Sequence, residues 1–152
     1  MSKLRVYLDN CCFNRPYDDQ EQKKIMLETE AKLKIQGKIK EGKLELVWSY
    51  MLDFENSANP NETVRSLIAE WKQLSIVTIV ETMELIKNAT DFNRQGIDAK
   101  DALHLACALE GKADLFFTTD TDIIKRADAI REMKVLNPVH FFIEHSTTEV
   151  TP

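Results

Sequence analysis

The sequence predicts an α/β fold, in which helices cover both faces of a parallel sheet. Two observations lead to this prediction. Short apolar runs with the character of buried strands alternate along the chain with longer segments of helical character, and this alternation is typical of a parallel sheet. Several carboxylates also stand just past the strand segments, at the edge where open α/β sheets bind their ligands.

The first third of the chain predicts a strand, a loop and a long helix. Residues 4–8 form the strand, and residues 10–18 are expected to form a loop because Asn14-Arg15-Pro16 continues neither strand nor helix well. The helix is expected from about Asp19 to Lys40. Its apolar stripe recurs every four residues, at Leu27, Ala31, Ile35 and Ile39.

The middle of the chain continues the alternation. Residues 44–49 predict a second strand, and residues 50–58 a short helix that ends before Asn59-Pro60. Asn61 can cap a further helix. The apolar positions of that helix follow helical spacing, at Val64, Leu67, Ile68 and Trp71.

The remaining elements complete a five-stranded pattern. We expect strands at residues 76–80, 115–118 and 134–136, and helices from residue 81 or 82 to about 93, from 98 to 110 and from 123 to 127. No interdomain linker interrupts the pattern. We therefore expect one domain over residues 1–145, followed by a loose polar tail at residues 146–152.

Composition limits the function classes. The apolar fraction of 43% and the charged fraction of 30% are ordinary for a globular protein. A net charge of −5 argues against a generally basic nucleic-acid coat, although a local basic rim is compatible with it. No apolar run approaches the ~18 residues of a membrane span, and no signal-peptide pattern is present. With three cysteines in no metal-binding spacing, these features predict a cytoplasmic protein with reduced thiols.

Four carboxylates are the candidate functional residues. Asp9 directly follows the first strand, Glu55 lies six residues after Ser49, Asp101 is in the first turn of the helix at 98–110, and Asp120 follows the fourth strand. The carboxyl ends of parallel strands share one edge, so these acids can meet in space. Converging carboxylates are ligands for hard divalent cations.

Each acid also has an ordinary structural interpretation. Asp9 can form an Asx-turn or a cap at the strand exit, and either Asp120 or Asp122 can cap the following short helix. We interpret Asp98 as the N-cap of its helix and Asp101 as the functional acid. Glu55 competes with Asp53, because each alone is typical of a solvated helix residue.

The motifs together resemble the PIN-domain family of metal-dependent nucleases, from about residue 4 to residue 143. The resemblance rests on Val6-Tyr7-Leu8-Asp9-Asn10, on Ser49 with Glu55, on Asp101-Ala102-Leu103-His104-Leu105-Ala106, and on the T-x-D segment Thr118-Thr119-Asp120. The last two motifs in tandem are specific. The chain is also similar in size to the toxins of VapBC toxin–antitoxin modules.

The resemblance implies a three-layer α/β/α sandwich with a five-stranded parallel sheet. It implies a site of Asp9, Glu55, Asp101 and Asp120 that holds one or two Mg²⁺ or Mn²⁺ ions, with possible help from Asp122. The implied activity is hydrolysis of phosphodiester bonds in single-stranded RNA, where divalent metals stabilise the anionic reacting groups. The implied partners are an antitoxin protein and a second copy of the chain.

Substrate contacts are expected from residues near the acids. Asn10 stands where the family often has Thr or Ser, and its amide can hydrogen-bond a ligand. The nearest basic candidates are Arg15 and Lys100, which Lys23 and Lys24 would extend into a rim for phosphates. His104, one turn after Asp101, is expected to pack against the sheet.

Two alternatives differ from the nuclease hypothesis. The acidic balance and the loose second motif are compatible with a PIN fold that serves as a binding or scaffold module with little catalysis. A receiver domain or a haloacid-type phosphatase is disfavoured. Val80 is followed by Glu81-Thr82 rather than by a phospho-acceptor aspartate, and Asp9 is followed by Asn10-Cys11 rather than by the x-Asp of a D-x-D motif.

Overall fold

Five parallel strands form one sheet in the computed structural model, which describes residues 3–142. In chain order the strands are β1 (Leu4–Leu8), β2 (Leu44–Ser49), β3 (Ser75–Ile79), β4 (Leu115–Phe117) and β5 (Lys134–Leu136). Their spatial order is β3-β2-β1-β4-β5, and every neighbouring pair is parallel. The predicted domain end at residue 145 and the tail at 146–152 lie outside the described residues.

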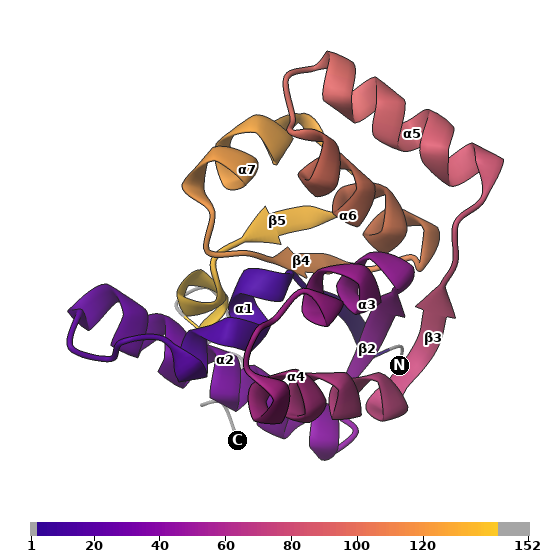
Figure 1. Cartoon of the computed structure of the whole chain (residues 1–152). Helices are drawn as coiled ribbons and strands as arrows, with labels where there is room; N and C mark the ends of the chain where they lie inside the picture. Colours follow the sequence, from indigo (N-terminus) through magenta and orange to yellow (C-terminus); the bar gives the residue numbers. More distant parts are fainter. Residues whose placement is uncertain (1–2, 143–152) are drawn as a thin grey trace.

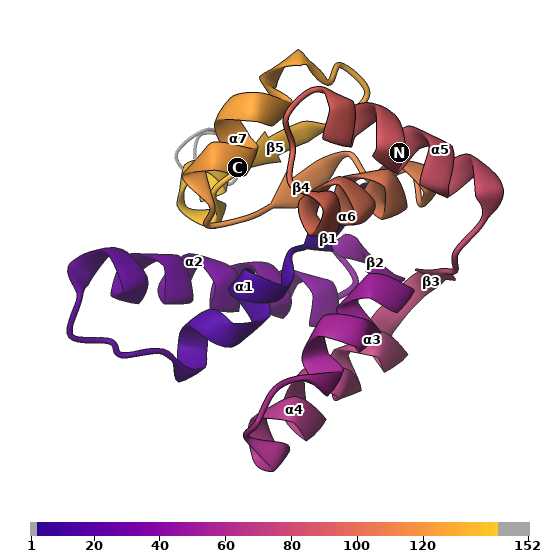
Figure 2. The same ribbon diagram turned by 45° about the horizontal axis from the view of Figure 1, so that its top comes forward.

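Helices cover both faces of the sheet (Figures 1 and 2). Figure 2 shows α5 (Met83–Arg94), α6 (Ala99–Glu110) and α7 (Thr121–Arg126) together in the upper part of the molecule. It shows α1 (Asn10–Asn14), α2 (Lys23–Lys40) and α4 (Glu62–Ala69) in the lower part. Helix α3 (Tyr50–Ser57) follows β2 directly. The predicted three-layer α/β/α sandwich with a five-stranded parallel sheet is therefore confirmed.

Alternate residues of the strands supply the two halves of the core, because successive side chains of a strand point to opposite faces. On one face, the Tyr7 ring stacks on Phe116 at 5.1 Å between centroids and meets the edge of His104 from α6. On the other face, Trp48 of β2 contacts Phe13 of α1 edge-to-face at 5.3 Å. All five rings are fully buried.

The expected loop at residues 10–18 is wrong. This segment forms α1 and a 3-10 turn, η1 (Arg15–Tyr17). Asp9 caps α1 by accepting a hydrogen bond from the Asn10 backbone N–H, and burial of Phe13 fixes the helix against the sheet. Tertiary packing here outweighs the weak local propensity of the segment.

Helix α2 starts at Lys23, four residues later than expected. The preceding residues hydrogen-bond among themselves instead: the Gln20 amide donates to the carbonyls of Arg15 and Asp18, and Asp19 accepts from the Glu21 backbone N–H. These local bonds compete with helical ones. The predicted stripe of α2 is buried at Ala31, Ile35 and Ile39, whereas Leu27 is 40% exposed.

Two other details differ from expectation. Asp98 stands at the N-cap position of α6, but its side chain makes no capping hydrogen bond. Trp71 lies in a second 3-10 turn, η2 (Glu70–Leu74), rather than in α4 itself. None of the described helices combines the length and the apolar character that crossing a membrane requires.

Candidate active site

The strand order brings the motif residues to one edge of the sheet. After β1, the chain adds β2 and β3 on one side, and β4 and β5 on the other. The connections therefore diverge at the carboxyl end of β1, which is where open parallel sheets form a crevice. Asp9 follows β1, α3 with Glu55 follows β2, and Asp120 follows β4.

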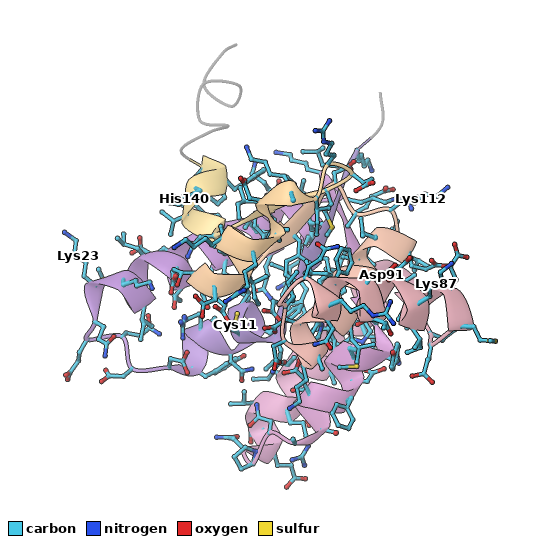
Figure 3. All side chains as sticks on the ribbon, turned by 90° about the horizontal axis from the view of Figure 1, so that it is seen from above. Cys11, Lys23, Lys87, Asp91, Lys112 and His140 are labelled. Carbon is cyan, nitrogen blue, oxygen red and sulfur yellow. The ribbon has the colours of Figure 1, made fainter. Side chains whose placement is uncertain are left out.

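Asp9 is held by hydrogen bonds on both of its carboxylate oxygens. Oδ1 accepts from the Asn10 backbone N–H at 2.8 Å, and Oδ2 accepts from the Thr118 hydroxyl at 2.9 Å. Cys11 Sγ also donates to Oδ2, and Figure 3 shows Cys11 near the middle of the molecule. Asp9 is only 7% exposed, so its carboxylate is fixed in position rather than free in solvent.

Thr118 joins the first motif to the fourth. Its hydroxyl donates to Asp9 and also accepts the backbone N–H of Asp120, at 3.1 Å. Asp120 in turn caps α7 by accepting the backbone N–H of Asp122 at 2.9 Å. The capping role predicted for this turn thus belongs to Asp120. One of its carboxylate oxygens makes that bond.

Glu55 belongs to a chain of buried polar groups that starts in the sheet. The Tyr7 hydroxyl lies 2.6 Å from Ser49 Oγ and 2.6 Å from His104 Nδ1. His104 Nε2 donates to Glu55 Oε1. Although burial alone would lower the pKa of His104, its hydrogen bond to Glu55 and the charge of Asp9 raise it. The bond from His104 likewise lowers the pKa of Glu55.

Asp101 shows the electrostatic consequence of gathering acids at one edge. Burial raises the pKa of its carboxyl to about 6, with further contributions from Asp9, Asp120 and Asp98. The three neighbouring acids act in the same direction as burial, because like charges nearby disfavour ionisation. A bound cation would relieve that repulsion.

A pocket of about 420 Å³ opens beside this cluster. The carboxylates of Asp98, Asp101, Asp120 and Asp122 line it, together with the exposed Arg126. Its walls come from the start of α6 and from α7, which are joined to β4 through Thr118 and Asp120. The pocket is polar and open to solvent, which suits a hydrated cation and an anionic ligand.

The donor atoms fit a divalent metal. Asp9, Glu55 and His104 each offer one ligand atom, and these atoms lie within 4.8 Å of one another. Because His104 uses its two ring nitrogens in the bonds to Tyr7 and Glu55, the carboxylate oxygens are the donors left for a metal, and such oxygens suit Mg²⁺ and Mn²⁺. The predicted assignment of Asp9, Glu55, Asp101 and Asp120 as the ligand set stays a prediction.

The structure distinguishes Asp53 from Glu55, the two acids of α3 that compete as the functional residue. Asp53 accepts from the Trp48 indole N–H at 3.0 Å and pairs with Lys72 at 2.9 Å. Both of its oxygens are thus used in holding α3 to β2 and to η2. Glu55, two residues later on the helix, is the acid that reaches His104.

The residues predicted to contact the substrate differ in how free their side chains are to bind it. The Arg15 guanidinium pairs with Glu28 at 2.9 Å and with Asp18 at 2.8 Å. Lys100 is exposed, and its charge contributes to the lowered pKa of Glu55. Asn10 buries its Oδ1 without a hydrogen-bond partner. Figure 3 places Lys23 at the periphery. Substrate binding by these residues stays a prediction.

Sequence reasoning understated three residues of this site. His104 was expected to pack against the sheet, which it does, but it also contacts Glu55. Tyr7 and Thr118 were read only as strand and motif residues. The available signal was spacing: Thr118 precedes Asp120 by two residues, and His104 follows Asp101 by three, on the same face of α6.

Comparisons with known proteins agree with this geometry. The family model of the PIN domain matches residues 6–130. A search of curated proteins found no match to the sequence. Among solved structures, the crystal structure of VapBC2 from Rickettsia felis bound to a DNA fragment from their promoter is similar, with a TM-score of 0.54 and 12% identity over 88% of this chain and 98% of that one. At such identity the likeness concerns the fold.

Proposed function

Because the chain belongs to the PIN-domain family, we propose that it is a Mg²⁺- or Mn²⁺-dependent endoribonuclease that hydrolyses phosphodiester bonds of single-stranded RNA. The observation that carries the proposal is geometric: ligand atoms of Asp9, Glu55 and His104 lie within 4.8 Å of one another, and Asp101 and Asp120 line one pocket. Burial, and then the charges of Asp9 and Asp120, raise the pKa of Asp101 to about 6. Acids that repel one another in this way are typical of a site where a cation balances them.

In this proposal Asp9, Asp101 and Asp120 hold the metal, and Glu55 either binds it or orients a water molecule. The metal, when bound, supplies charge neutralisation of the phosphodiester and activation of water. The residues of the chain do the positioning. Thr118 fixes the Asp9 carboxylate, and His104 fixes that of Glu55, so neither must reorganise when the substrate arrives.

RNA binding is proposed to use the residues next to the acids. Lys100, exposed at the start of α6, is placed to meet a phosphate, and the unpartnered Asn10 amide can hydrogen-bond a sugar or a ligand water. Arg15 would contribute only if the substrate displaced Asp18, because its guanidinium already serves two carboxylates.

The test measures cleavage of a fluorescent single-stranded RNA by the purified chain with Mn²⁺ and in excess EDTA. We expect cleavage only with metal, and a loss of roughly three orders of magnitude in Asp9→Asn and Asp101→Asn. Asp91→Asn is the matched control, an acid on the outer helix α5 that Figure 3 labels. Equal rates in all four proteins, or undiminished cleavage in EDTA, would refute the proposal.

A binding module with little catalysis is the second candidate. It is favoured by the structural uses of the acids: Asp9 and Asp120 cap helices, and Glu55 pairs with His104. Calorimetric titration with Mn²⁺ separates the two candidates. No heat of binding at millimolar metal favours the module, whereas saturable binding that Asp101→Asn abolishes favours the nuclease.

We further propose that the chain is the toxin of a type II toxin–antitoxin pair and that it forms a homodimer. The fold of the VapBC2 structure supports the first part, and its description names two proteins together with promoter DNA. Expression of the chain alone should arrest bacterial growth, and Asp101→Asn should not. Light scattering on the purified chain tests the dimer; a monomeric mass would exclude it.

A further inference from the structure

A second pocket is lined by residues of α2 and α4 and of the turns η1 and η2. Figure 1 shows α2 and α4 in the lower part of the molecule. The pocket has a volume of about 480 Å³. We call it the Lys32 groove, after the lysine that lines it together with Gln36, Lys40, Trp71, Leu67 and Leu74. No residue of the motifs described above lines it.

Lys32 is the unusual residue of this groove. Its side chain is buried, at 3% exposure, yet no carboxylate of the described residues pairs with its ammonium. The nearest groups of note are aromatic: Nζ lies 5.5 Å from the Phe13 ring centroid and 6.0 Å from that of Trp71. Burial lowers the pKa of Lys32 to about 7, so the fold carries a cost for keeping a charge there.

A buried donor without a partner stands one helical turn further along. Gln36 is 5% exposed, and its Nε2 is buried without a hydrogen-bond partner in the described part of the chain. Residues four apart share one face of a helix, so both donors face the same groove. Lys40 extends the row by another turn, with Nζ 5.1 Å from the Trp71 centroid. The acid in the lining, Glu70, is exposed.

Gln36 Nε2, buried without a partner, requires an acceptor, and the ammonium groups of Lys32 and Lys40 in the same groove select an anion. A carboxylate fits this demand because its two oxygens can accept from an ammonium and an amide together. The groove therefore supplies the hydrogen-bond donors, and the molecule that binds there would supply the acceptor.

The apolar residues at the rim of the groove indicate what kind of ligand would supply the carboxylate. Leu33, Leu67 and Leu74 are 51%, 41% and 45% exposed, although they stand next to one another around the buried donors. Apolar side chains surrounding a desolvated polar anchor are the anatomy of a protein interface. A nucleic acid would be met by open cations rather than by leucines.

We propose that the Lys32 groove docks a partner polypeptide, which inserts an aspartate or glutamate side chain between Lys32 and Gln36 and covers the exposed leucines with apolar neighbours. The proposal rests on the geometry of α2 and α4 and holds whether or not the acids at the sheet edge cleave RNA.

The experiment selects peptides from a phage-displayed random 12-residue library on the full chain, in EDTA so that nuclease activity plays no part. We expect enriched peptides with an acidic residue between apolar ones. Synthetic versions are then titrated by fluorescence anisotropy against the natural chain and against three variants: Lys32→Met, Leu67→Lys, and Lys34→Met.

Lys32→Met should weaken binding roughly tenfold or more, because it removes a charge-assisted hydrogen bond. Glu→Gln or Asp→Asn in the peptide should cost a similar factor, and should cost nothing further in Lys32→Met. Leu67→Lys should weaken binding through the rim. Lys34→Met is the matched control: Lys34 is exposed on the same helix, and its Nζ lies over the Phe142 ring rather than in the groove.

Several results would overturn the proposal: no enrichment, enriched peptides without an acid, or peptides that bind Lys32→Met as tightly as the natural chain. Preferential capture of a fluorescent RNA hexamer that Lys32→Met abolishes would point to a nucleic-acid site instead and would also overturn it. Lys32→Met replaces a buried charge with an apolar side chain of similar length, so it should fold, and its melting curve verifies this.

Discussion

The sheet edge and the Lys32 groove both gather charged side chains, but with opposite signs and by different means. At the edge, acids from the end of β1, from α3, from α6 and from the turn after β4 come together, and hydrogen bonds from Thr118 and His104 hold two of them, Asp9 and Glu55, in place. In the groove, Lys32 and Lys40 lie over aromatic rings, and Gln36 Nε2 is buried without a hydrogen-bond partner in the described residues.

The two regions differ in how much of a binding site the chain itself supplies. The edge is organised in advance, because hydrogen bonds already orient the Asp9 and Glu55 carboxylates. The groove supplies hydrogen-bond donors but no acceptor, so in our proposal a partner supplies the acceptor. The first arrangement suits chemistry on a small anionic group, and the second suits recognition of a polypeptide.

The substitution Asp101→Asn is the strongest test of whether the acids at the sheet edge are placed for chemistry rather than for stability. The pKa of Asp101 is raised, so the folded chain binds this proton more tightly than the unfolded chain does. Stability from this group is fully present below the ordinary carboxyl pKa and is lost as the pH rises toward about 6. At pH 7 without metal, Asp101→Asn should therefore stabilise the fold, by on the order of 1 kcal/mol once solvent screening of this half-exposed group is allowed for.

The same substitution should lower RNA cleavage by roughly three orders of magnitude, so stability and activity move in opposite directions. Urea unfolding at pH 7 and the cleavage assay measure the two effects on one sample. A variant that is both less stable and inactive would mean that Asp101 serves the fold rather than a metal.

His104→Gln tests the positioning of Glu55, with a smaller expected effect. Losing the imidazole that orients a ligand should cost roughly 10–100-fold in Mn²⁺ affinity and in cleavage. The KM for RNA should change little, because His104 is buried and does not face the substrate. A rate equal to that of the natural chain would leave His104 as a core residue only.

The pH dependence of His104→Gln has a defined sign. The raised pKa of His104 gives stability that is complete below its ordinary value of 6.5 and is lost at higher pH. The lowered pKa of Glu55 gives stability that is complete above its ordinary value of 4.5. The variant should thus lose most stability between these two values, and urea titrations at pH 5.5 and pH 9 measure the contrast.

The smallest effect concerns the groove without its partner. The pKa of Lys32 is lowered to about 7, so between that pH and the ordinary lysine value of 10.5 the unfolded chain binds the proton more tightly. Lys32→Met should be more stable than the natural chain at pH 7, by on the order of 1–2 kcal/mol, and the advantage should shrink toward pH 10. Chemical denaturation across this range checks it, and an equal or lower stability at pH 7 would contradict a cost of burying the lysine.

The edge could be predicted from the sequence to a far greater extent than the groove. Strand runs and their order along the chain place Asp9 and Asp120 at strand ends, and parallel pairing then brings them together. The choice between Asp53 and Glu55 could not be made that way, because it depends on which acid the Trp48 indole reaches.

The groove was invisible in the sequence for a physical reason. A lysine in a charged helix reads as a solvated residue, and Lys32 has lysines on both sides in α2. Its burial depends on Trp71, which arrives from η2, a turn that helical spacing misplaced in α4. The α1 helix was missed likewise, since contacts distant in sequence rather than local propensity hold it.

The bond between Asp9 and Thr118 has a consequence for how the protein is made. It joins residues 109 positions apart, and the backbone N–H of Asp9 also depends on the carbonyl of Phe117. A chain emerging from the ribosome cannot assemble its acidic edge until the segment around residue 120 has left the exit tunnel, because domains form as their last strands arrive. In the ribonuclease that we propose, this order of assembly would leave the acidic edge incomplete for most of translation, so that the messenger RNA would be spared until a full copy of the chain exists.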